Sequence, residues 1–211
     1  MQPEKNLILQ RSKPWATVVV VGLALVAFCS NRLGELLIYR RSLILGGQFW
    51  RAWSGHIVHY GWSHLIWDLA VFIPTGLWLE HLHARAARLL YLLAPLLISQ
   101  TLLAFDPTLE RYAGLSGLAA GTLVGLACFQ LRQKNEPAWP WLAALLLLCV
   151  KVSIELGKGT PLLVSDFKGI RNVPLAHIVG GLTGAGCSLL VPPKTFLRPA
   201  PETPDDILLE S

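Results

Sequence analysis

The chain has 211 residues, of which 53% are hydrophobic and 15% charged, and its formal net charge is +5. Soluble domains carry roughly 25% charged residues, so this composition excludes an ordinary soluble domain and indicates an integral membrane protein. Lysines and arginines do not alternate with aromatic residues on a polar face, which argues against nucleic-acid binding. We assign the positive charge to membrane topology and to anionic lipid headgroups.

The N-terminal quarter predicts a tail, a first membrane helix and an interfacial segment. Residues 1–14 are polar and basic, and we expect them to form a cytoplasmic tail. The apolar run from Trp15 to about Ser30 is just long enough to span a bilayer. It resembles a signal sequence, but no small-x-small cleavage site follows it, so we predict an uncleaved helix. Residues 31–61 are too apolar for a free loop and too broken for a span, which predicts a partly membrane-embedded loop.

Five further apolar runs each approach the roughly 20 residues that a bilayer requires. They cover residues 62–79, 89–105, 115–131, 138–156 and 174–191. We therefore predict an all-α polytopic membrane protein, with one six-helix membrane domain over 15–191 and a flexible tail at 192–211. Basic residues divide equally between the two sides, but the cluster before the first helix favours cytoplasmic termini.

Ser116 and His177 are the candidate catalytic residues. Ser116 lies in Gly114-Leu115-Ser116-Gly117 at the start of one apolar run, and His177 lies inside another. Glycines recur every four residues on both helices: Gly117, Gly121 and Gly125 on the first, Gly180 and Gly184 on the second. Such spacing lets helices approach closely, which would bring the serine and its base together. The alternative is that both glycine sets serve packing only and that a backbone carbonyl satisfies His177.

A second group of ionisable residues falls between residues 50 and 68. Its pattern is Trp50-Arg51-x4-His56-x2-His59-x4-His64-x3-Asp68. His64 and Asp68 share a helix face, and a donor imidazole in a water-poor cavity could stabilise an oxyanion. A metal or haem site is the alternative, although the absence of H-E-x-x-H argues against an intramembrane zinc protease. His81 and His83 stand beside arginines, and we expect them in a solvated loop.

Together these motifs resemble the rhomboid family of intramembrane serine proteases over roughly residues 45–190. The matching pieces are Trp50-Arg51, His59 with His64, Gly114-Leu115-Ser116-Gly117, and Ala176-His177-x-x-Gly180-x-x-x-Gly184. Gly76-x-x-x-Glu80 also resembles the family's second-helix motif, with Ala84 where a further glycine is usual.

The resemblance implies a six-helix bundle with a water-filled cavity and no cofactor. Ser116 would be the nucleophile and His177 the general base, and His64 with the Ser116 backbone N–H would form the oxyanion hole. Arg51 and Glu80 would pair to hold the 31–61 segment, which the structural histidines His56 and His59 would order. The implied substrate is a membrane protein cleaved within or near its transmembrane segment, and we expect the enzyme in a bacterial inner membrane.

Asp68 departs from the family pattern, which usually has asparagine there. An ionised aspartate would repel an oxyanion. We therefore expect Asp68, a further candidate for the oxyanion hole, either to be protonated by an apolar site or to orient His64 as a donor.

The compact size resembles the rhombosortase branch, whose members are thought to process proteins with a C-terminal Gly-Gly, helix and basic-cluster tail. Two rival interpretations stay open. One is a catalytically silent rhomboid-like protein that binds membrane helices, and the other is a metal or haem membrane protein.

Overall fold

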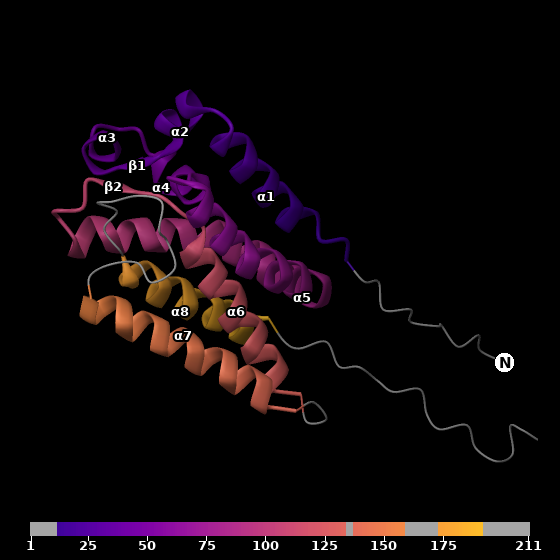
Figure 1. Cartoon of the computed structure of the whole chain (residues 1–211). Helices are drawn as coiled ribbons and strands as arrows, with labels where there is room; N and C mark the ends of the chain where they lie inside the picture. The colour runs from indigo at the N-terminus through magenta and orange to yellow at the C-terminus, as the bar shows by residue number, and fades with distance from the viewer. Residues whose placement is uncertain (1–11, 134–136, 159–172, 192–211) are drawn as a thin grey trace, which may run out of the picture.

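A computed structural model describes residues 12–133, 137–158 and 173–191. Within these ranges the chain forms helices and one two-stranded sheet (Figure 1). The elements are α1 (Trp15–Phe28), α2 (Asn31–Leu37), β1 (Tyr39–Arg40), α3 (Arg41–Leu45), α4 (Arg51–Ser54), the 3-10 turn η1 (Gly55–Ile57), α5 (Trp62–Phe105), β2 (Arg111–Tyr112), α6 (Ser116–Leu131), α7 (Trp139–Lys158) and α8 (Pro174–Leu190). The expected C-terminal tail and most of the expected N-terminal tail lie outside the described residues.

The apolar helices follow the predicted spans, with one difference in how they are divided. The spans expected at 62–79 and 89–105 are two arms of α5, which is 44 residues long and broken at His83, where φ is −137° and ψ is 60°. By length and composition, α5 and α7 can cross a membrane, and α1 with α2 makes a third candidate bent by 117°. The helices α6 and α8 are apolar but shorter. The chain is thus a helical polytopic membrane protein, and the count of six crossings stays a prediction.

The expected solvated loop around His83 is wrong. The chain is helical on both sides of His83, and its buried imidazole stacks on Phe129 of α6 with ring centroids 3.6 Å apart. Arg85 and Arg88, just beyond the kink, are exposed. One non-helical residue is enough to bend the helix here. The polar residues around His83 therefore do not mark a loop, although their polarity suggests one.

Glycine faces hold α6 against α8, as their spacing predicts. A Cβ atom on Gly121 would lie 2.8 Å from the carbonyl oxygen of Gly180, and one on Gly125 would lie 3.2 Å from that of Gly184. Real Cβ atoms avoid such distances, so the two backbones approach in a way that larger residues would prevent. The predicted close packing of these two helices is confirmed.

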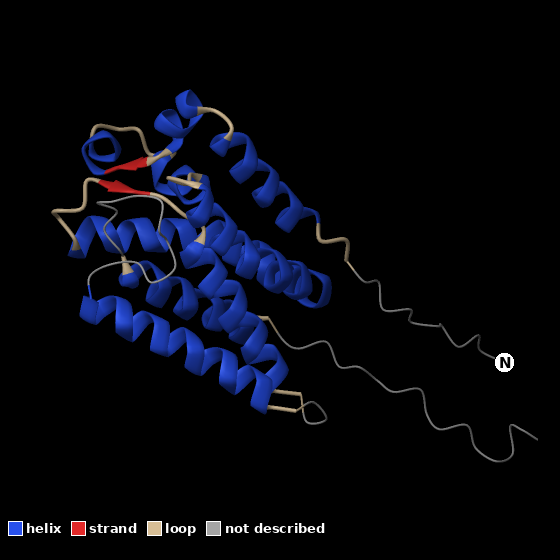
Figure 2. Cartoon of the chain, viewed as in Figure 1, coloured by secondary structure: helices blue, strands red, loops and turns tan. Residues whose placement is uncertain are grey.

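The segment at 31–61 lies at one end of the helix bundle. Figure 2 shows β1 and β2 side by side at this end, near α2 and α3. The strands pair antiparallel, with Tyr39 opposite Tyr112. Because β2 leads directly into the Gly114–Ser116 turn, this pairing ties the segment to the loop that carries the candidate nucleophile.

Candidate active site

Ser116 is the first residue of α6 and is half-buried. The first N–H groups of a helix have no partner within it, and the helix dipole adds partial positive charge there. Gly114, two residues earlier, has φ of +122°, a conformation that residues with a side chain rarely adopt. The turn therefore places a hydroxyl beside backbone N–H groups that can donate to an anion.

The α5 residues His64 and Asp68 lie against this turn. A Cβ atom on Gly114 would collide with Nε2 of His64 and would lie 3.1 Å from Oδ2 of Asp68. Gly114 is thus required for space as well as for its dihedral angle. The sequence predicts that the His64 imidazole donates to an oxyanion, and this ring lies next to the turn that leads to Ser116.

His177 lies in the first turn of α8 and is buried. Its neighbour Ala176 contacts the neighbour of Ser116, because a Cβ atom on Gly117 would lie 3.0 Å from the Ala176 carbonyl oxygen. The starts of α6 and α8 therefore lie side by side. Ser116 and His177, 61 positions apart in the chain, are brought to the same place in the fold.

Asp68 is held between two histidines. Its Oδ2 atom lies 3.2 Å from Nε2 of His59 and 3.4 Å from Nε2 of His64, and all three side chains are buried. Through this contact Asp68 could orient the His64 ring, and its role stays a prediction. Within the described chain, no group of three or more His, Cys, Asp and Glu residues is arranged to hold a metal ion.

The comparison with protein families decides the membership of the chain. A model described as the Rhomboid domain matches residues 46–194. The chain belongs to the rhomboid family. None of the curated proteins compared with it matched. Rhomboids are generally intramembrane serine proteases that act on membrane-protein substrates in the bilayer, and this rhomboid is an integral membrane protein.

His56 links the 31–61 segment of this rhomboid to α5. Its Nε2 lies 3.2 Å from the Ser99 hydroxyl, which itself donates to the Ala52 carbonyl at 2.5 Å. The ring also meets Tyr112 edge-on at 5.1 Å between centroids. Burial lowers the pKa of His56 to about 3, so the imidazole is neutral at physiological pH. These contacts join the 31–61 segment to α5, and the structural role expected for His56 stays a prediction.

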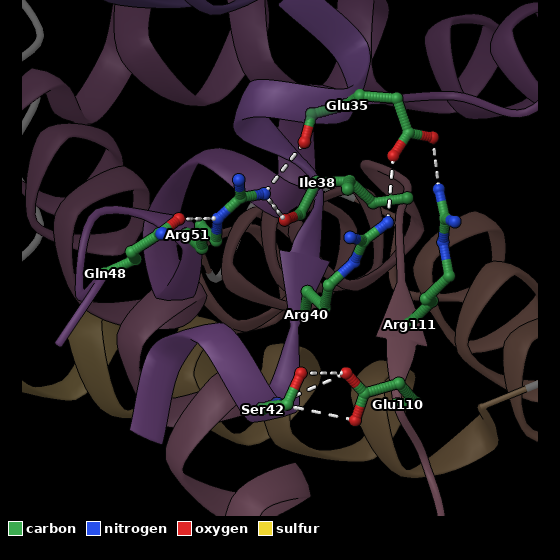
Figure 3. A network of polar contacts seen from close by, with 8 residues as sticks. All are labelled: Glu35, Ile38, Arg40, Ser42, Gln48, Arg51, Glu110 and Arg111. Carbon is green, nitrogen blue, oxygen red and sulfur yellow. Dashed lines mark hydrogen bonds and ion pairs between the residues drawn. The ribbon is translucent and has the colours of Figure 1, made fainter. Parts of the chain in front are cut away.

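The expected pair between Arg51 and Glu80 does not form. Arg51 is buried in the 31–61 segment, where it donates to the Gln48 side chain at 2.7 Å and to the carbonyls of Glu35 and Ile38 at 2.9 Å each (Figure 3). Its guanidinium thus binds backbone rather than a carboxylate. The Glu35 carboxylate instead meets Arg40 and Arg111, and Ser42 meets Glu110, which joins the two strand segments (Figure 3).

Glu80 instead secures α1 of the rhomboid fold. Its fully buried carboxylate accepts from the backbone N–H groups of Ala16 and Thr17 at 3.1 and 2.8 Å, and from the Thr17 hydroxyl at 2.9 Å. A carboxylate at a helix N-terminus satisfies unpaired donors and favours the dipole. Gly76, one turn before Glu80, gives α1 room, since its Cβ would lie 3.0 Å from Thr17 Cγ2. The Gly76-x-x-x-Glu80 motif is therefore a docking site for α1.

Two residues near the site were missed from the sequence. Tyr112 lies beneath the turn, with its hydroxyl 3.4 Å from the Gly114 carbonyl, and burial raises the pKa of its phenol. Glu155 on α7 is buried, and its Oε2 lies 3.5 Å from Nδ1 of His177. An acidic residue inside an apolar run is a signal that could have found Glu155.

Proposed function

We propose that this rhomboid is an intramembrane serine endopeptidase with Ser116 as nucleophile and His177 as general base. The observation that carries the proposal is the contact between Gly117 and Ala176, which brings the starts of α6 and α8 together. A hydroxyl next to a buried imidazole is the arrangement that activates a serine. Its position in a membrane domain suits substrates that are themselves in the bilayer.

The reaction proceeds by acyl transfer. As the Ser116 oxygen bonds to the substrate carbonyl carbon, its proton passes to Nε2 of His177. The imidazolium then gives that proton to the leaving amine as the C–N bond breaks, which leaves an acyl-enzyme. Water, deprotonated by the same imidazole, attacks the ester and releases Ser116.

The charge that develops on the carbonyl oxygen needs donors. The Ser116 backbone N–H at the start of α6 and the His64 ring beside Gly114 are the groups we assign to this oxyanion hole. Donors fixed before the reaction are worth more in a water-poor site than in water. Asp68 lies 3.4 Å from Nε2 of His64, and we assign it the role of holding that ring.

The substrate we propose is a membrane-anchored protein. A helical peptide bond is shielded by its own backbone hydrogen bonds, so the substrate helix must unwind locally before attack. Glycine near the cleaved bond favours that unwinding, because it is a poor helix former. The Gly-Gly sorting tails of rhombosortase substrates have this character, and they are the candidate we favour.

We also propose six crossings of a bacterial inner membrane. The crossings are α1, the two arms of α5, α6, α7 and α8. The start of α1 and the end of α8 lie at the same end of the bundle (Figure 1), which suits an even number. The basic residues before α1 favour placing this end in the cytoplasm.

Fluorophosphonate labelling of the purified full chain tests the enzyme proposal. We expect covalent labelling of wild type and none of Ser116→Ala. Ser153→Ala is the matched control, because Ser153 is an exposed serine on α7, and it should label like wild type. A wild-type protein that resists labelling while still binding membrane helices would indicate a silent rhomboid, and labelling that persists in Ser116→Ala would remove Ser116 as nucleophile.

A further inference from the structure

Glu155 is the one buried residue of α7, and the proposed reaction does not use it. The other side chains of this helix, Trp139–Lys158, are half-exposed or exposed, whereas Glu155 is 2% exposed. An acidic side chain in an apolar membrane helix is costly and is by default a candidate for function. Its burial therefore calls for an account of what the carboxylate contacts.

The Glu155 carboxylate lies between a lysine and the candidate base. Lys151, one turn earlier on α7, places Nζ 2.7 Å from both carboxylate oxygens. On the other side, Oε2 lies 3.5 Å from Nδ1 of His177 on α8. Lys151 supplies the countercharge that an ionised carboxylate needs in this setting. Glu155 is thus arranged to face His177 as an anion.

We propose that Glu155 is a positioning residue for His177. Its carboxylate accepts the Nδ1 proton of the imidazole, which fixes the ring orientation and leaves Nε2 bare to take the Ser116 proton. During acyl transfer the Nδ1 proton stays on the ring, and the imidazolium that forms is stabilised by the adjacent anion. This inference rests on the proposed serine protease function and adds a third residue to its dyad.

The contact between Glu155 and His177 is longer than a hydrogen bond, and Nδ1 of His177 has no hydrogen-bond partner within the described residues. A hydrogen bond to nitrogen spans 2.7–3.2 Å, so the gap of 3.5 Å must close slightly. Catalytic hydrogen bonds often tighten only when substrate binds. Among the described residues, the other acid near His177 is Asp68, but that carboxylate contacts His59 and His64. Glu155 is accordingly the carboxylate that we assign to Nδ1.

The test replaces the ion pair by apolar residues of similar size. The double variant Lys151→Met/Glu155→Met removes both charges together, an exchange that buried pairs commonly tolerate without loss of stability. We expect an unfolding midpoint near that of wild type, with fluorophosphonate labelling of Ser116 slowed about tenfold or more. Ser153→Ala on the same helix should label at the wild-type rate. A double variant that labels at the wild-type rate would show that the pair is only structural and would overturn the inference.

Nitrogen NMR of histidine-labelled protein gives a readout that does not depend on activity or on the variant's folding. Wild-type His177, assigned by the loss of its signals in His177→Asn, should carry its proton on Nδ1. A proton on Nε2 would overturn the inference. Failure of the proposed function looks different: wild type would not label at all, or Ser116→Ala would label, whatever the state of Nδ1.

Discussion

Gly117 of α6 lies so close to Ala176 of α8 that a Cβ atom on Gly117 would come within 3.0 Å of the Ala176 carbonyl oxygen. This contact lies one residue from Ser116 and one residue from His177. The glycine spacing lets the two helices touch. It therefore also sets the distance between the backbone positions that carry the two candidate catalytic side chains. Stability and proposed activity should both depend on this line of glycine contacts between α6 and α8, which we call the seam.

Gly180→Ala is expected to damage the seam. The added methyl group would collide with the backbone of Gly117, and overpacking of this kind costs about 1–3 kcal/mol. Gly186→Ala is the matched control on α8, because a Cβ there meets nothing within 4 Å, and it should be neutral or gain up to about 1 kcal/mol from helix propensity. Unfolding of the detergent-solubilised protein measures both, and equal stabilities would contradict the packing account.

Arg51→Lys is expected to loosen the 31–61 segment. Lysine cannot reproduce the fork in which Arg51 donates from Nε to Gln48 and from Nη1 to the Glu35 and Ile38 carbonyls. Buried carbonyls left unpaired cost about 1–3 kcal/mol. Arg40→Lys should change stability by less than about 1 kcal/mol, since its pair with Glu35 is solvent-exposed. If the two variants unfold alike, Arg51 is not the anchor of this segment.

The stability of the fold should depend on the neutrality of His56. Burial lowers the pKa of His56 to about 3, whereas in the unfolded chain histidine titrates near 6.5. The contribution of the neutral ring is therefore fully present above pH about 6.5 and is lost as the pH falls toward 3, by up to about 1.4 kcal/mol per pH unit. His56→Gln cannot titrate, so its free energy of unfolding should fall less steeply between pH 6.5 and 4.5. Parallel curves for the two proteins would refute the buried neutral state.

Variants of Asp68 distinguish a role in positioning His64 from a direct role in the reaction. Asp68→Asn keeps an oxygen that can accept from His64 or His59, and it should label with fluorophosphonate at least as fast as wild type. Asp68→Ala frees the ring and should label more slowly, by about tenfold. Wild-type rates for both variants would remove any role for Asp68 in the reaction.

The sequence predicts contacts along a single helix or between repeated motifs far better than contacts between unlike elements. The glycine spacing on α6 and α8 predicts their seam because small residues at four-residue intervals have one main use in membranes. The partners of Arg51 are backbone carbonyls, which no residue pattern names. The kink at His83 needs one unusual dihedral pair and leaves no mark in composition. Glu155 meets His177 only through the register between α7 and α8, which the sequence does not determine. The four-residue spacing between Lys151 and Glu155, in contrast, can be read from the sequence.

The labelling rate of Ser116 in His177→Ala tests the central claim most directly. If His177 activates the serine, wild type should react with a fluorophosphonate about a hundredfold or more faster than His177→Ala, with the adduct mapped to Ser116 by mass spectrometry. The Thr183→Val variant, altered elsewhere on α8, controls for effects on the helix and should react like wild type. A His177→Ala protein that reacts as fast as wild type would contradict the proposed Ser116–His177 dyad.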